Sequence, residues 1–211
     1  MAGNLSIVNT IGKVISQSQD LYADYIKSDY IASDMYVDGL KTRGQIKDKS
    51  NSYTLREENT KMMTCELTIP VKRGSYIQLK KDRNDDDYSI KGIVTTYPVQ
   101  TPVDFYFYTL FFNTIVTRIR NEEIYDEDGN VVSKNPVLTD TIDCFVQRIG
   151  MRERQVDAGI DSNSVNQLIT IKKWDLKIDD ILYIGSDRYI ITDLYELDKD
   201  MLDARMTYYR Y

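Results

Sequence analysis

The most informative absence in this chain of 211 residues is histidine, of which there is none. Without histidine the chain cannot form a Ser-His-Asp or Cys-His nucleophilic arrangement or an HExxH zinc site, and it lacks the commonest general base near neutral pH. The sequence also contains no G-x-x-x-x-G-K-[ST], G-x-G-x-x-G, G-x-S-x-G or S-x-x-K motif. We therefore expect no enzymatic activity and no cofactor. A pair of carboxylates that the fold brings together in a pocket would revive the enzyme hypothesis, but no spacing in the sequence points to such a pair.

The few cysteines and the acidic runs do not predict a metal site. Cys65 and Cys144 are far apart and form no C-x-x-C pair, so we expect two buried thiols. The run D-E-D-G that ends at Gly129 is similar to part of a calcium loop, but the first and last ligand positions would then be Ile124 and Asn135. Both residue types are wrong for an EF-hand. A hairpin turn at this run is the better interpretation.

Long apolar runs and an excess of positive charge are also missing. No run approaches the roughly 20 residues that span a bilayer, and no basic segment followed by an apolar one opens the chain, so we expect neither an anchor nor a signal peptide. The chain has 27 Lys and Arg against 33 Asp and Glu, a net charge of −6. Because DNA affinity depends on cationic groups that displace counterions, we expect no DNA-binding surface.

Tyrosine is abundant, with 17 residues against 5 Phe and 1 Trp. Tyrosine favours strands, and it is also enriched where protein surfaces meet. The excess therefore has two interpretations that the sequence leaves open. The chain is either simply rich in β-structure, or its solvent-facing strands contact other subunits.

The last stretch, Val165–Tyr211, has the period-2 pattern and turn residues of a small β-unit. We predict a hairpin that joins Ile181–Ile184 to Tyr189–Ile191, because Gly, Ser and Asp separate these β-forming runs. The final strand should bury one face and leave Arg205 and Thr207 in water.

A similar unit occurs earlier in the chain, which predicts two divergent copies, with a single continuous β-domain as the alternative. The proposed equivalences are Leu67–Ile69 with Ile169–Ile171, Tyr88–Ile90 with Tyr189–Ile191, Phe105 and Phe107 with Met206 and Tyr208, and Val37, Asp38 and Arg43 with Ile142, Asp143 and Arg148.

Ahead of the first copy, apolar residues spaced near 3.6 predict an amphipathic helix over Asn4–Tyr30. This helix either packs on the β-domain or extends to a neighbouring subunit. A strand should follow over Tyr36–Gln45, then a polar loop over Lys47–Asn59. We expect the next strand over Met63–Val71, with Pro70 at a sheet edge.

Three further segments complete the prediction. Lys80–Asp87 should be a solvated hairpin tip, and Phe105–Phe112 a strand covered on both faces. Between the copies, Thr109–Asp140 should form an arm whose hairpin turns at Asp128 and Gly129 and which ends at Asn135 and Pro136.

The resulting fold class is mainly β, with two small β-barrel or sandwich-like units, an N-terminal amphipathic helix and a central hairpin arm. The predicted division is a helical arm at 1–35, a first β-unit at 36–108, a connecting strand and hairpin arm at 109–140, and a second β-unit at 141–211.

The C-terminal pattern L-K-I-D-D-I-L-Y-I-G-S-D-R-Y-I-I-T-D-L-Y, followed by M-T-Y-Y-R-Y, resembles the small β-barrel head-closure and related neck proteins of tailed bacteriophages. In that family the phrase is x-G-D-x-h-x-h-x-G-x-x-Y-x-h, where h is apolar. Asp179 and Asp180 stand where the family often has Gly-Asp. The residues that fit the phrase are Ile181, Tyr183, Gly185, Tyr189 and Ile191. The match covers about the last 45 residues; the departures are the greater length and the N-terminal helix.

The resemblance implies a non-enzymatic structural protein of the virion, made in the host cytoplasm. It implies a homo-oligomeric ring of twelve subunits between the portal and the tail, through which genomic DNA passes without specific binding and in which no membrane takes part. A tail or baseplate protein, or a host-directed binding module, built from the same β-units is the alternative. The candidate subunit contacts are Asp126, Asp128, Gly129 and Asn130 in the middle hairpin, Asp85, Asp86 and Asp87 in the first unit, and Tyr208, Tyr209 and Tyr211 at the C-terminus.

Overall fold

The computed structural model describes residues 12–18, 20–21, 24, 32–47, 55–81, 86–101, 104–151, 154, 163–198 and 200–209. It divides the chain into two compact units, Met1–Phe111 (unit 1) and Phe112–Tyr211 (unit 2). Strands dominate both units, which confirms the predicted fold class. None of the helices in the described ranges is long and apolar enough to cross a membrane.

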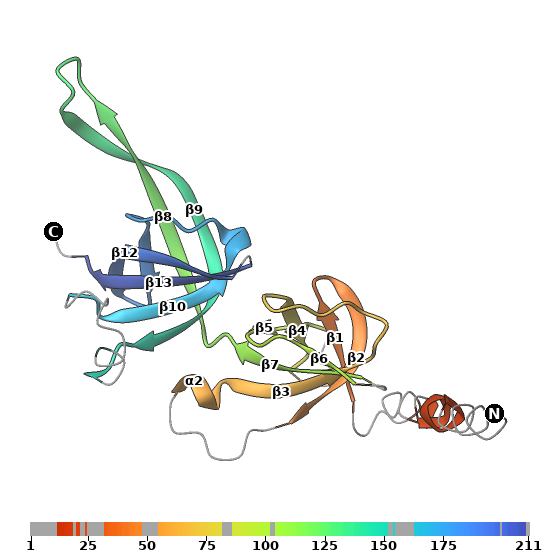
Figure 1. The fold of residues 1–211 in the computed structure, drawn as a ribbon. Coiled ribbons are helices and arrows are strands. Elements are labelled where there is room, and N and C mark those ends of the chain that lie inside the picture. The colour runs from red at the N-terminus through yellow and green to blue at the C-terminus, as the bar shows by residue number, and fades with distance from the viewer. Residues whose placement is uncertain are drawn as a thin grey trace, which may run out of the picture. The chain divides into compact units, whose positions relative to one another are not determined.

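Unit 1 contains a closed six-stranded antiparallel barrel (Figure 1). Its strand order is β3-β2-β1-β4-β5-β7, and the barrel closes because β3 also pairs with β7; the short strand β6 adds to β7. The elements are β1 (Ser33–Val37), β2 (Leu40–Lys47), the short helix α2 (Leu55–Glu58), β3 (Thr60–Cys65), β4 (Tyr76–Leu79), β5 (Ile90–Val94), β6 (Val99–Gln100) and β7 (Phe105–Phe111).

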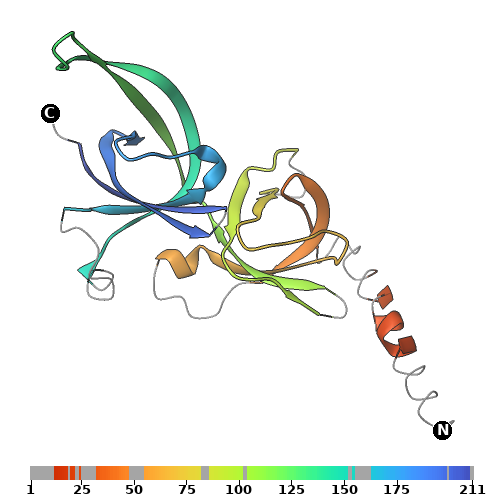
Figure 2. The ribbon, with the colours of Figure 1, turned by 45° about the horizontal axis from the view of Figure 1, so that its top comes forward.

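Unit 2 contains a second closed barrel, with the order β10-β13-β12-β11-β8-β9 (Figure 2). Strands β8 and β9, the first two of this unit along the chain, extend beyond the others as a long hairpin. The elements are β8 (Thr114–Tyr125), β9 (Val131–Arg148), β10 (Asn166–Ile171), the 3-10 helix η1 (Lys172–Trp174), β11 (Ile181–Ile184), β12 (Asp187–Asp198) and β13 (Met201–Tyr208).

The two barrels have the same topology. Reading around unit 1 as β1-β2-β3-β7-β5-β4 gives the pairing sequence β8-β9-β10-β13-β12-β11 of unit 2, with every neighbouring pair antiparallel. The strands β5 and β7 thus take the places of β12 and β13, as the equivalences at Tyr88–Ile90 and Phe105 predicted. This common topology supports two copies of one unit.

Two of the proposed equivalences are wrong. Leu67–Ile69 lies in the turns after β3, whereas Ile169–Ile171 lies in β10, whose counterpart is β3 itself. Val37 ends β1 and Asp38 begins a turn, whereas Ile142 lies inside β9. Short β-forming triplets recur by chance, so the sequence placed these residues one element away from their true counterparts.

Alternation along the strands directs one set of apolar side chains into each barrel. The core of unit 1 is built from Met35, Val37, Met63, Cys65, Ile69, Val71, Ile77, Leu79, Val94 and Phe107. That of unit 2 is built from Val116, Ile142, Cys144, Leu168, Leu176, Leu182, Tyr189, Ile191, Leu202, Ala204 and Met206. Both cysteines are buried and free, as predicted.

Several predicted strand boundaries in unit 1 are wrong. Tyr36–Gln45 is not one strand, because Asp38 and Gly39 adopt positive φ angles of 50° and 84° and turn the chain between β1 and β2. The predicted loop over Lys47–Asn59 contains α2. The predicted strand over Met63–Val71 begins earlier, at Thr60, and ends at Cys65.

Three expectations about exposure and strand ends also fail. β7 is not covered on both faces, because Tyr106 is 37% exposed. The outer face of β13 is not wet, because Arg205 is buried beside Asp203. Asn135 and Pro136 do not end the arm; they lie inside β9, where a register shift next to Asn121 accommodates the proline, which cannot donate a ladder hydrogen bond.

The predicted N-terminal helix is present at residues 12–18, 20, 21 and 24, and the rest of Asn4–Tyr30 lies outside the described residues. Val14, Ile15 and Leu21 of its apolar stripe are exposed. Lys80 and Lys81 open the connection between β4 and β5, as predicted for a hairpin tip.

Candidate functional site

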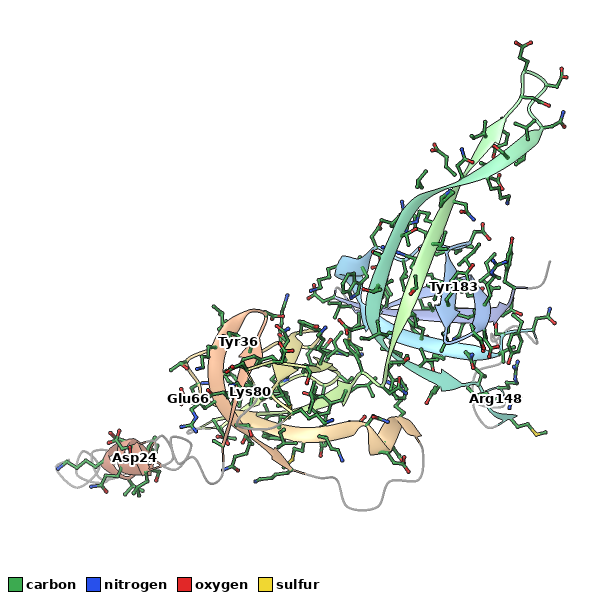
Figure 3. The ribbon with its side chains drawn as sticks, turned by 180° about the vertical axis from the view of Figure 1, so that it is seen from behind. Asp24, Tyr36, Glu66, Lys80, Arg148 and Tyr183 are labelled. Atoms are coloured by element: carbon green, nitrogen blue, oxygen red, sulfur yellow. The ribbon has the colours of Figure 1, made fainter. Side chains whose placement is uncertain are left out.

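The long hairpin of unit 2 is the feature best suited to contact another molecule. Among the described residues, β8 pairs with β11 only at Thr117–Ile119, and β9 pairs with β10 only at Phe145–Arg148. Residues 120–138, which we call the arm, therefore form strand ladders only within the hairpin. Figure 3 shows side chains along both sides of this projecting ribbon. A two-stranded ribbon with two open edges has little stability of its own in water, so it offers both surface and backbone groups to a partner.

Four of the predicted contact residues build the turn at the tip of the arm. The Oδ1 atom of Asp126 accepts hydrogen bonds from the backbone N–H groups of Asp128 (3.0 Å) and Asn130 (2.8 Å). These bonds, the one to Asn130 above all, lower the pKa of the Asp126 carboxyl. Gly129 adopts a φ of 81°, which glycine reaches without strain. The turn is thus a fixed structure, as the D-G signal predicted.

The flanks of the arm combine exposed apolar side chains with carboxylates. Glu123 and Lys134, which face each other across the two strands, form an ion pair, and the Tyr125 hydroxyl donates a 2.9 Å hydrogen bond to Glu123. These contacts lower the pKa of Glu123 and hold the ribbon together. The exposed large apolar residues on the arm are Ile124, Tyr125, Val131, Val132 and Val137.

Buried charges anchor the base of the arm, and sequence reasoning missed them. Arg118 in β8 is almost fully buried. Its guanidinium donates to both oxygens of Asp140 on the facing strand, Nε at 2.9 Å and Nη2 at 2.6 Å. Its Nη1 donates to the carbonyl oxygens of Trp174 (2.5 Å) and Asp175 (3.1 Å). One side chain thereby joins β8, β9 and the connection between β10 and β11.

A second arginine repeats this anchoring two residues further along β8. The Arg120 guanidinium binds both oxygens of the buried Asp180, with distances of 2.6 Å and 2.8 Å, and donates to the Asp175 carbonyl oxygen. The hydrogen bond to Asp180 raises the pKa of Arg120, and Arg120 lowers the pKa of Asp175. The spacing of Arg118 and Arg120 could have indicated this pair of anchors, because residues two apart on a strand lie on the same face of the sheet.

The C-terminal tyrosines lie near this base. Tyr208 ends β13 and stacks on Tyr189, with ring centroids 4.9 Å apart. Tyr209 lines an open groove of about 430 Å³ together with Arg120, Lys134 and other residues at the foot of the arm. The structure therefore brings Tyr209 close to the arm, and Tyr211 lies outside the described residues.

The acidic candidate residues of the first unit and the arm belong to different units. Asp86 and Asp87 are exposed in the connection between β4 and β5 of unit 1, whereas the arm belongs to unit 2. Asp85 lies outside the described residues.

Comparisons with known proteins add no identification. Neither a protein-family model nor a curated protein matches this sequence. In the part of the chain that the structure describes, no group of three or more Asp, Glu and Cys side chains is placed to hold a metal ion. The inference of function therefore depends on the geometry of the arm and the barrels.

Proposed function

We propose that this chain is a non-enzymatic structural protein of a tailed-phage virion, and that copies of it assemble into a ring in the neck between portal and tail. The observation that carries the proposal is the arm, which projects from the barrel of unit 2 (barrel 2; the barrel of unit 1 is barrel 1). The arm has exposed apolar side chains and two open strand edges. Such an element is suited to join one subunit to the next.

The duplicated barrel also supports this role. The last strands and the β11–β12 hairpin carry the sequence pattern that resembles head-closure proteins, and they belong to a closed barrel. The buried pairs of Arg118 and Arg120 fix the foot of the arm to that barrel. A rigid foot gives the arm a defined direction, which a contact repeated around a ring requires.

The charge distribution fits a passage for DNA. Unit 2 contains 13 Lys and Arg against 19 Asp and Glu, whereas unit 1 contains 14 of each, so the whole net charge of −6 belongs to unit 2. A channel lined by unit 2 would repel the phosphate backbone and let DNA slide, most strongly at low salt.

Deletion of Asp126–Asn130 tests the role of the arm. We expect the shortened chain to fold, because the tip lies beyond the barrel ladders, but to assemble poorly or to release DNA from the particles. Fluorescence of Trp174, the single tryptophan, reports whether barrel 2 is intact. A normal yield of infectious particles from this variant would contradict the proposal.

Quantitative mass spectrometry of purified particles tests the location. About twelve copies in DNA-filled heads without tails, the number the resemblance implies, would support a neck ring. Presence only in particles with tails would favour the alternative of a tail or baseplate protein, and absence from particles would overturn the virion assignment.

A further inference from the structure

The arm must have a receiving surface if copies of this chain associate through it. We propose that the arm of one copy docks on the β6 edge of barrel 1 of the next copy, on a patch formed by Arg73, Tyr97, Val99 and Tyr106. This docking contact on the β6 edge patch would specify how the subunits of the proposed ring are joined, and it rests on that proposed function. The two surfaces differ, so the contact is head-to-tail and can repeat from copy to copy.

The charge balance of the two units directs the arm towards unit 1. Beyond Arg120 the arm carries a single cation, Lys134, which is already paired with Glu123. Its other carboxylates are Glu122, Asp126, Glu127 and Asp128. The rest of unit 2 is acidic as well, so an arm that approaches unit 2 of a neighbour meets like charge. Unit 1 is neutral as a whole and imposes no such repulsion.

On the strands of the unit 1 barrel, exposed apolar surface is concentrated at β6, while the N-terminal helix carries a separate exposed stripe of Val14, Ile15 and Leu21. Val99 and Tyr106 are direct partners in the β6–β7 ladder and are 45% and 37% exposed. Tyr97, just before β6, is 72% exposed. The other exposed large apolar side chains on the described strands of this barrel, Leu40 and Ile46, stand singly at the two ends of β2. The β6 edge patch is thus the apolar site in barrel 1 that matches the exposed valines of the arm.

The patch also supplies a cation. The Arg73 guanidinium lies over the Tyr97 ring, 5.4 Å from its centroid. Arginine and tyrosine are among the residues most enriched at the energetic centres of protein interfaces. Since the tip of the arm is acidic, Arg73 beside an apolar surface complements both features of the arm.

The backbone of β6 provides a matching edge. Within the described residues β6 pairs only with β7, at Val99 and Gln100, so its other edge meets no other described strand. The arm has open edges of its own, and two open edges can join in one sheet across the interface. Because β6 has two residues, apolar contact must supply most of the stability and the edge mainly sets the register.

Crosslinking between two variants that each carry one added, exposed cysteine tests this contact. Val132→Cys on the arm and Val99→Cys on the patch are made in separate full-length chains, one of them carrying a size tag, and the mixture is treated with a short bismaleimide. A product of mixed size must then join two different copies. The native Cys65 and Cys144 are buried and do not compete.

The matched control replaces Val99→Cys by Leu40→Cys, a similarly exposed position on the same barrel. We expect mixed-size product to form several-fold faster with Val99→Cys than with Leu40→Cys. The Arg73→Glu change on the patch chain should reduce that product, and Glu127→Lys on the arm chain should restore part of it.

Light scattering of the same chains separates the two proposals. If the chain forms oligomers but Val99→Cys crosslinks no faster than Leu40→Cys, the docking site is overturned and the proposal of a ring stands. A chain that stays monomeric at high concentration would overturn both the contact and the self-assembly on which the ring depends. Oligomers with the preferred crosslink and the charge rescue would establish the contact.

Discussion

Removal of one partner from the buried pair between Arg120 and Asp180 should strongly destabilise barrel 2. Asp180 is 1% exposed, and its carboxylate accepts two hydrogen bonds from Arg120 and one of 2.9 Å from the backbone N–H of Lys177. The Arg118 guanidinium also lies 3.7 Å from it. Asp180→Asn keeps the size of the side chain, removes its negative charge and leaves two arginines facing a neutral amide.

The expected loss follows from the environment of the two arginines. Removal of one partner of a buried ion pair costs about 3–5 kcal/mol, because the remaining charge is left buried. Arg120 is 19% exposed and keeps its contacts with Asp175, and Arg118 keeps Asp140. The free energy of unfolding should therefore fall by about 3 kcal/mol, the lower end of that range.

Urea unfolding followed by Trp174 fluorescence measures this loss, since the single tryptophan packs against the core of barrel 2. With a urea dependence of about 1–3 kcal/mol per molar, the midpoint should fall by about 1–3 M. Asp179→Asn is the control. Asp179 is exposed and has a φ of 71°, which asparagine tolerates, so its midpoint should barely change.

Equal midpoints for Asp180→Asn and Asp179→Asn would refute the reasoning. A second check is the variant that also carries Arg120→Met. If uncompensated charge is the cause, the double variant should lose less stability than the sum of the two single variants.

Three further results are expected. Gly44→Ala should destabilise barrel 1 by about 1–3 kcal/mol, because a Cβ there would collide with a backbone carbonyl of β3, whereas Gly12→Ala meets open space and should cost nothing; tyrosine fluorescence in urea compares them. Cys65 and Cys144 should resist a thiol reagent at pH 8 until the chain is unfolded. Burial raises the pKa of Cys65 from 9.0 to about 12, so its contribution to stability is present below pH 9 and is lost as the pH rises towards 12, which alkaline unfolding measures. Asp126→Ala should speed amide exchange at the tip of the arm and leave the Trp174 unfolding midpoint unchanged. Because the pKa of Asp126 is lowered, the turn of the unmodified chain should loosen only as the pH falls below 3.8, as NMR titration would show.

The features that the sequence predicted correctly depend on short-range patterns. Turn residues between β-forming runs located the β11–β12 hairpin and the tip of the arm, because a positive φ at Gly129 or Gly185 is a local requirement. The failures involve competing local signals. Asp38 and Gly39 form a two-residue turn and carry the same Asp-Gly signal as the tip of the arm, but the apolar residues on either side of them indicated one continuous strand.

Long-range pairing decided the candidate site. Local alternation predicted that Arg205 would face water, whereas the tertiary structure buries it beside Asp203. Asp175 and Asp180 follow Arg118 and Arg120 by more than 50 residues, and no local pattern indicates that they meet. Tyr209 reaches the foot of the arm for the same reason, since β13 returns to close the barrel.

From the sequence alone it follows that the chain is rich in strands, that its thiols are unpaired, that histidine chemistry is absent and where the tip of the arm and the β11–β12 turn lie. These properties depend on composition and on side chains a few residues apart. The tertiary structure alone reveals that the strands close into two barrels of one topology, which residues anchor the arm and how far the arm extends. Those outcomes depend on pairings between residues far apart in the chain, because a strand's edge is satisfied by whichever segment the whole fold brings beside it.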